Sequence, residues 1–177
     1  METPSKETGG FIIGKMDSAF LGRKRQRALF TIAIYQLQTA EATSSSWGPG
    51  NLRAYERVQG SIGGMNFKVA GGYHSHPEDD PELSEDDGDV EYAVDAIKDL
   101  QRKGIRTAKE SRWLEIVVSV KKKLYQQTYE RDFRLTNLKR KIRCTLRMGS
   151  NIGYDLTLGA YWIYDDGNYD EAEIYVR

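Results

Sequence analysis

The stretch Gly72-Tyr-His-Ser-His-Pro-Glu-Asp-Asp-Pro-Glu-Leu-Ser-Glu-Asp-Asp87 joins two segments of different periodicity. Residues 67–76 read as a β-strand that ends at Pro77, because proline has no backbone donor for a sheet. Residues 89–103 carry one apolar stripe at helical spacing, and Gly104 follows as a C-terminal cap. The stripe consists of Val90, Ala93, Val94, Ile97 and Leu100. The sequence therefore predicts a strand, an acidic loop and a helix, in that order.

The chain has two histidines, and both stand on the predicted strand. Side chains alternate across a strand, so His74 and His76 point to the same face, where two imidazoles can bind a divalent transition metal. Ten residues after Pro77 let the chain turn back and bring the carboxylate of Asp87 to the same point. A structural zinc site would need four protein ligands and is usually rich in cysteine, whereas Cys144 is the only cysteine. If a metal binds, the pattern predicts an open site with three protein ligands. A bare His-x-His on its own would favour an incidental polar loop.

The spacing of these residues resembles the zinc motif of the JAMM (MPN-plus, JAB-like) metalloproteases. That motif is His-x-His, seven residues, Ser, two residues, Asp, and it is matched without a gap by His74, His76, Ser84 and Asp87. The stretch Glu7-Thr-Gly-Gly-Phe-Ile-Ile-Gly14 is similar to the upstream glutamate segment of prokaryotic members. By motif and order of elements the resemblance covers residues 7–104, and residues 105–177 agree in strand content only.

The resemblance implies a role for each matched residue. His74, His76 and Asp87 would bind one zinc ion per chain. Glu7 would act as general base, deprotonate the attacking water and pass the proton to the leaving amine. Ser84 would donate a hydrogen bond to the oxyanion of the tetrahedral intermediate.

The sequence leaves an alternative open for three of these assignments. Glu7 stands near the N-terminus, where a solvated side chain is the ordinary interpretation. Ser84 precedes an acidic residue by three positions, as in a capping box, and could cap the following helix, with or without a catalytic role. Asp86 stands beside Asp87 and would be the ligand if the loop register differed.

The function implied by the resemblance is a zinc-dependent isopeptidase, deubiquitinase-like, that cleaves after the C-terminal Gly-Gly of ubiquitin or a ubiquitin-like modifier. One alternative is a metallohydrolase of the same fold that acts on a sulfur-carrier protein or on small peptides. The other is a non-catalytic scaffold, a class that typically lacks the metal ligands. Four acidic side chains adjoin the motif and would attract a basic extended tail: Glu78, Asp79, Asp80 and Glu82.

The remaining segments predict a sheet protein. Strands are expected at residues 11–14, 28–37, 113–120, 153–164 and 172–176, with a hairpin of 124–134 and 139–148 at a sheet edge. Residues 44–51 read as a loop, and residues 54–64 support no assignment. The pattern predicts an α+β or α/β fold, and the resemblance implies the MPN (JAB-like, cytidine-deaminase-like) mixed sheet flanked by helices. No linker is evident, so we expect a single domain over residues 1–177.

Composition and charge indicate which classes of partner to expect. The formal net charge is zero, which gives no whole-chain case for nucleic acid. Residues 121–147 hold ten basic residues against two acidic ones but carry no nucleic-acid motif, so we read them as a solvated face. There is no apolar run of about 18 residues to span a membrane. A lone cysteine fits a reducing compartment, and we expect a cytoplasmic protein.

The family usually has a helix and a strand before the glutamate, whereas six residues precede Glu7 here. This difference is compatible with a truncated chain. It is also compatible with a partner subunit, or a second copy in a homodimer, that completes the edge of the sheet.

Overall fold

The computed structural model describes residues 8–21, 24–36, 52–65, 67–77, 80–84 and 88–175. The strands are β1 (Gly9–Leu21), β2 (Lys24–Gln36), β3 (Lys68–Pro77), β4 (Arg112–Leu124), β5 (Asp132–Asn137), β6 (Lys141–Arg147), β7 (Ile152–Tyr164) and β8 (Tyr169–Glu171). The helices are α1 (Leu52–Ile62), which a 3₁₀ turn (Gly63–Met65) extends, and α2 (Asp89–Arg102). Together they form an α+β fold built on one mixed sheet.

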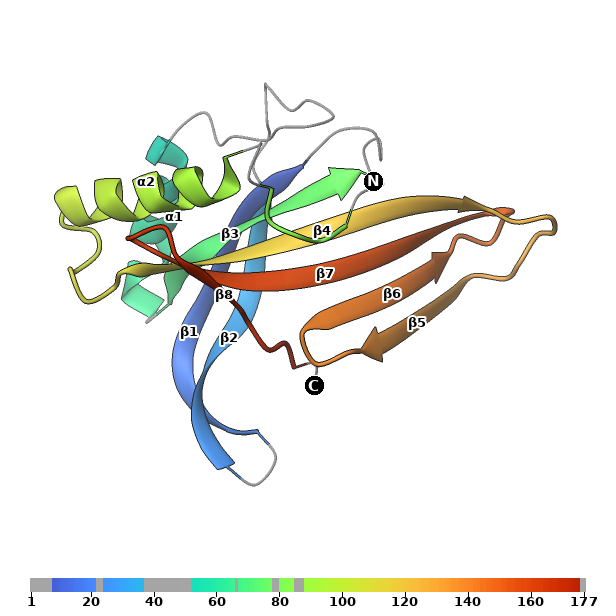
Figure 1. The fold of residues 1–177 in the computed structure, drawn as a ribbon, viewed down its shortest axis with the longest axis horizontal. Coiled ribbons are helices and arrows are strands. Elements are labelled where there is room, and N and C mark those ends of the chain that lie inside the picture. The colour runs from blue at the N-terminus through green and yellow to red at the C-terminus, as the bar shows by residue number, and fades with distance from the viewer. Residues whose placement is uncertain are drawn as a thin grey trace.

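Seven strands lie side by side in the order β2-β1-β3-β4-β7-β6-β5, and the short β8 pairs with β7 (Figure 1). All neighbours are antiparallel except β3 and β4. These two strands run parallel because α2 carries the chain back along the sheet between them. The parallel pair places the end of β3 and the start of α2 beside the middle of β4, where His74 lies opposite Val117 and Pro77 opposite Val120.

Both helices pack on one face of the sheet. Their buried side chains include Val58 of α1 and Ile97 of α2, which share a core with Phe11, Trp113 and other sheet residues. A smaller cluster lies apart from it, where Ile12, Leu114 and Ala160 meet Ala172 from the segment after β8. The site-bearing strand β3 is thus paired on both sides by β1 and β4 and lies beside a helix-covered core.

Most predicted elements are confirmed. The predicted strands 11–14, 28–37, 67–76, 113–120 and 153–164 correspond to β1, β2, β3, β4 and β7. The apolar stripe over 89–103 forms α2, and Gly104 follows it with φ +70°, a conformation that glycine adopts without strain. Residues 54–64, which supported no assignment, lie entirely in α1 and the 3₁₀ turn. The predicted loop 44–51 falls outside the described residues.

Two predicted boundaries are wrong. The hairpin exists as β5 and β6 with β5 at the sheet edge, but residues 124–131 are not part of its first strand. Leu124 ends β4, and the chain then forms a loop in which Tyr125 donates its backbone N–H to Asn151 and Tyr129 to Ser150. The predicted last strand, 172–176, is also displaced, because the short β8 precedes it.

The position of β8 follows from the length of β6. Strand β6 pairs with β7 only as far as Gly159, and β8 occupies the free edge of β7 from Tyr161 to Ile163. Ala172 and Ile174 then donate backbone hydrogen bonds to Ala160 and Lys139 in an irregular segment.

The edges of the described sheet are β2 and β5. Strand β1 is paired on both sides, so a partner subunit or second copy would have to join another strand, such as β2 or β5; such a partner remains a prediction. Among the described helices, none has the length and apolar character needed to cross a membrane.

Candidate metal centre

Strand β3 places both histidines on one face, as the alternation predicts. The Nε2 atoms of His74 and His76 are 3.0 Å apart, and the side chains are buried, with 4% and 6% of their surface exposed. In the sheet, His74 lies opposite Gly9 of β1 and Val117 of β4. Because β3 has a hydrogen-bonded strand on each side here, the backbone that carries the imidazoles is fixed.

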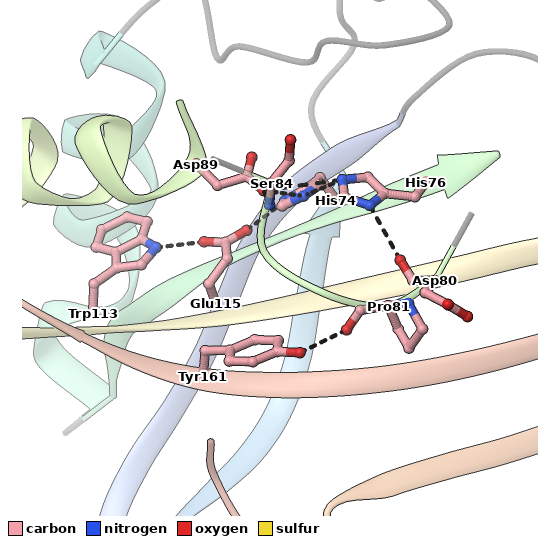
Figure 2. Close-up of polar contacts among 9 residues, drawn as sticks. All are labelled: His74, His76, Asp80, Pro81, Ser84, Asp89, Trp113, Glu115 and Tyr161. Carbon is pink, nitrogen blue, oxygen red and sulfur yellow. Dashed lines mark hydrogen bonds and ion pairs between the residues drawn. The ribbon is translucent and has the colours of Figure 1, made fainter. Parts of the chain in front are cut away.

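Helix α2 supplies a carboxylate to the same point (Figure 2). Oδ2 of Asp89, the first residue of α2, is 3.3 Å from Nε2 of His74 and 4.0 Å from Nε2 of His76. The same oxygen accepts a 2.9 Å hydrogen bond from the backbone N–H of Ser84. The chain enters the helix through Gly88 at φ 73°, and no side chain caps it there. The backbone N–H of Ser84 thus contacts the site, and Gly88, not Ser84, occupies the N-cap position of α2.

The three donor groups suit a transition metal. The ligand atoms of His74, His76 and Asp89 all lie within 4.8 Å of one another. Ligand atoms around a tetrahedral zinc are about 3.3 Å apart, given Zn–N bonds of about 2.0–2.1 Å. The separations of 3.0, 3.3 and 4.0 Å therefore need only small shifts to enclose an ion. We call these three residues the metal centre.

A buried carboxylate lies behind His74. Glu115 of β4 is 4% exposed, and its Oε1 is 2.8 Å from Nδ1 of His74. Its other oxygen accepts a 2.6 Å hydrogen bond from the indole N–H of Trp113. Gly72, the register partner of Glu115, leaves room for this carboxylate, because a Cβ atom there would lie 2.8 Å from Oε2.

His76 is held by the loop that follows it. Its Nδ1 is 3.4 Å from the backbone carbonyl of Asp80. The next carbonyl, that of Pro81, accepts a 2.8 Å hydrogen bond from the hydroxyl of Tyr161 on β7 (Figure 2). Gly159 lets this loop approach the sheet, since a Cβ atom there would lie 2.4 Å from the same carbonyl. Both imidazoles thus direct Nδ1 to an oxygen acceptor and Nε2 toward the metal centre.

The charges in the centre support one another. Burial alone would lower the pKa of His74, but the adjacent carboxylates of Asp89 and Glu115 outweigh it and raise the pKa from 6.5 to about 10. Burial would raise the pKa of Asp89, but the interaction with His74 and the Ser84 N–H hold it below its usual value. Without a metal, His74 is therefore protonated at neutral pH, and a metal must displace that proton to bind.

Several residues predicted for the site cannot be compared with the structure. Glu7, Glu78, Asp79, Asp86 and Asp87 lie outside the described residues. The residue after Glu7 is described: Thr8 donates its backbone N–H to the Ser75 hydroxyl and accepts a hydrogen bond from the Ser75 N–H. The segment that follows the predicted base is thus tied to β3 between the two histidines.

The described part of the acidic loop is partly neutralised. Asp80 and Glu82 are exposed, and each has a basic neighbour. Lys121 lies 3.9 Å from the carboxylate of Asp80, and Lys141 lies 3.1 Å from that of Glu82. These ion pairs reduce the field that the loop could exert on a basic tail.

Two residues of the site were missed by sequence reasoning. Asp89 was assigned only to the predicted helix, although a carboxylate in the first turn faces the loop before it and could have been considered. Glu115 carried a clearer signal, because it interrupts the apolar run Trp113-Leu-Glu-Ile-Val-Val118 of a strand. A carboxylate inside such a strand must find hydrogen-bond donors, so its position indicates a polar site beneath.

A scan of protein-family models and a search of curated proteins both return no match to this chain. The chemistry of the site is therefore inferred from its side chains. Two buried imidazoles and a carboxylate can hold a metal ion, and three protein ligands leave a position open for water or substrate. Such a site suits a Lewis acid that activates water or polarises a carbonyl.

Proposed function

We propose that this protein is a zinc-dependent hydrolase of the JAMM type that cleaves after the C-terminal glycines of ubiquitin or a ubiquitin-like modifier. The observation that carries the proposal is the buried group of His74, His76 and Asp89, whose ligand atoms all lie within 4.8 Å of one another. Its two histidines are those of the motif spacing, and Ser84 of the same motif lies against Asp89. The proposal includes an MPN (JAB-like) classification of the mixed sheet.

The order of elements around the centre supports that classification. The histidines stand at the end of a strand, a helix follows, and the next strand pairs parallel to the first. Strand β1, which begins two residues after the predicted glutamate, pairs antiparallel with the same histidine strand, with Gly9 opposite His74. Three segments far apart in the sequence therefore meet at one point, as a site with a remote general base requires.

In the proposed reaction, His74, His76 and Asp89 hold the ion. Zinc, when bound, supplies Lewis acidity that polarises the scissile carbonyl and acidifies water. Glu7 accepts the proton of the attacking water and delivers it to the leaving amine. The Ser84 hydroxyl donates a hydrogen bond to the oxygen on which negative charge develops, a contribution of about 3 kcal/mol where one such donor has been removed elsewhere.

The third ligand is the point at which spacing and geometry differ. The motif spacing predicts Asp87, which lies outside the described residues. The described geometry supports Asp89, whose Oδ2 already touches His74 and is fixed by a backbone N–H. We therefore assign the third ligand to Asp89. That Asp87 is the ligand remains a prediction, and substituting each residue in turn distinguishes the two assignments.

The proposed substrate class rests on the family resemblance more than on the acidic loop after β3. An extended glycine tail could lie beside the centre as an added strand. The acidic loop was expected to attract a basic tail, but its described members Asp80 and Glu82 have lysine partners. We expect shape and backbone pairing to select the tail more than charge. A sulfur-carrier protein or a small peptide would meet the same chemical requirements.

The experiment compares cleavage and zinc content in wild type, Glu7→Gln and the control Glu130→Gln, whose side chain is exposed in the loop before β5. The substrates are fusions that carry a ubiquitin, a ubiquitin-like or a sulfur-carrier protein upstream of the scissile bond. We expect Glu7→Gln to keep its zinc and to lose cleavage by about 100-fold or more, and the control to lose neither. Unchanged cleavage in Glu7→Gln would contradict the role of the base. A zinc-loaded wild type that cleaves none of the fusions or small peptides would contradict the hydrolase.

A further inference from the structure

We propose that Glu115 and Trp113 form a positioning pair that fixes the tautomer of His74 and thereby sets the metal affinity of the centre. The inference rests on the proposed function only in requiring a metal at the centre. It does not depend on the substrate or on Glu7, so a metal-affinity measurement tests it apart from hydrolysis.

The alternation of β4 brings the pair under the histidine. Trp113 and Glu115 stand two residues apart on one face of the strand, and both are buried. Glu115 is opposite Gly72, and the missing side chain of that glycine opens the space through which the carboxylate reaches His74. Figure 2 shows the resulting row of indole, carboxylate and imidazole, and Asp89 approaches His74 from α2.

Burial of this carboxylate requires donors, and two lie at hydrogen-bond distance. The indole N–H of Trp113 is 2.6 Å from one oxygen, and Nδ1 of His74 is 2.8 Å from the other. Indole nitrogen is a donor only, so the first oxygen must accept. Where the second oxygen also accepts, the hydrogen of that bond is on Nδ1 of His74.

This requirement determines which nitrogen can bind the metal. With a proton fixed on Nδ1, the neutral imidazole of His74 has its lone pair on Nε2. That atom is the one 3.0 Å from Nε2 of His76 and 3.3 Å from Oδ2 of Asp89. Outer hydrogen bonds of this kind orient the ligands of metal sites, and their loss typically lowers metal affinity 10–100-fold.

An amide at position 115 cannot replace the carboxylate. If the oxygen of a glutamine accepts from Trp113, its NH₂ group faces Nδ1 of His74 and requires that nitrogen to be an acceptor. The imidazole would then carry its proton on Nε2 and could not ligate through that atom. If the amide flips, its NH₂ group meets the indole N–H, donor against donor. Removing the indole N–H should release this conflict, so the effect of the amide should depend on residue 113.

The test measures the zinc dissociation constant by chelator competition for wild type, Glu115→Gln, Trp113→Phe and the double variant. We expect Glu115→Gln to weaken binding about 10–100-fold and Trp113→Phe to weaken it by less. In the double variant the amide can turn its oxygen to His74, so zinc binding should recover relative to Glu115→Gln. A purely structural role predicts the opposite, because two disruptive core changes would add.

Two further measurements distinguish a change in metal affinity from a loss of folding. The far-ultraviolet circular dichroism of each metal-free variant confirms that it folds, and the visible spectrum of bound Co²⁺ reports the geometry at the ion. A changed Co²⁺ spectrum in a folded Glu115→Gln protein supports the positioning pair. Wild-type affinity in Glu115→Gln, or no recovery in the double variant, overturns it while leaving the proposed function intact. A wild type that binds no metal overturns both.

Discussion

The part of the sheet beneath α2 and the β5–β6 hairpin differ in what surrounds their side chains. Between the helix and the sheet, Phe11, Ile97 and Trp113 are at most 1% exposed. On β5, Phe133 is 58% exposed and Leu135 is 43% exposed, and the strand has a neighbour on one side only (Figure 1). The metal centre lies in the first region, where neighbouring strands and a helix together fix its ligands.

The charged side chains of the two regions have different surroundings. In the covered region, carboxylates such as Glu115 and Asp89 are buried and hydrogen bonded to a histidine or to backbone. On the hairpin and its neighbours, several of the basic residues that the sequence gathers in 121–147 form ion pairs at the surface instead. Examples are Arg140 with Glu171 and Lys139 with Glu173. Surface pairs of this kind contribute little to stability.

The largest expected difference is in stability. Ile97→Ala would leave a cavity between α2 and the sheet and should lower the free energy of unfolding by about 2–5 kcal/mol. Leu135→Ala on the exposed strand should lower it by no more than about 0.5 kcal/mol. Urea denaturation of the metal-free proteins measures both. Equal losses in the free energy of unfolding would show that the hairpin contributes as much to stability as the helix-covered region.

The second prediction concerns pH. The pKa of His74 is raised from 6.5 to about 10 in the metal-free protein, so zinc must displace its proton across this window. Zinc affinity should therefore rise up to about tenfold per pH unit between about pH 7 and about pH 9. The metal-free protein should lose stability over the same window, because a raised pKa stabilises the fold below 6.5 and ceases to do so near 10. Zinc affinity that stops rising near pH 7 would indicate an ordinary histidine.

A substitution at Gly72 tests the close packing of the covered region. Gly72→Ala would bring a Cβ atom to 2.8 Å from the Glu115 carboxylate, and we expect a loss of about 1–3 kcal/mol together with weaker zinc binding. Gly60→Ala on α1 is the matched control, since a Cβ atom there meets nothing within 4 Å and alanine favours a helix. Thermal unfolding and zinc titration of both variants measure the two effects. Unchanged stability and zinc affinity in Gly72→Ala would mean that the Glu115 side chain can move away from position 72.

The smallest effect is expected where the loop meets the hairpin. A double-mutant cycle with Glu82→Gln and Lys141→Gln should give a coupling energy of about 0.2–1 kcal/mol, because Glu82 is exposed and Lys141 is partly exposed. The same variants should change the cleavage of a modifier fusion by less than about threefold, within the energy of one exposed pair. A strong loss of turnover at low salt in Glu82→Gln alone would restore the role of charge in attracting the substrate tail.

Sequence patterns predicted the regular parts of the molecule well. Period-two alternation located β3 and with it the shared face of His74 and His76, and the apolar stripe located α2. Both patterns are local, so neighbouring residues suffice to define them. The pairing of β3 with both β1 and β4 depends on contacts between distant segments, which no local pattern encodes.

The same limit explains what was missed at the site. Counting residues from His76 gave Asp87, whereas the described carboxylate beside the histidines is Asp89, two residues later at the start of the helix. Loop conformation, including the positive φ of Gly88, decides which carboxylate turns inward, and spacing alone does not fix it. Glu115 comes from a strand 41 residues beyond His74, so only the fold could bring it to the imidazole.

The most direct test of the central claim is the zinc content of the purified protein after reconstitution and removal of loose metal, beside His76→Ala, Asp89→Asn and Asp87→Asn. We predict stoichiometric zinc in wild type and in Asp87→Asn, and its loss in His76→Ala and Asp89→Asn. Loss in Asp87→Asn with retention in Asp89→Asn would transfer the third ligand to the residue that the motif spacing names. A wild-type protein that retains no zinc would contradict the metal centre itself.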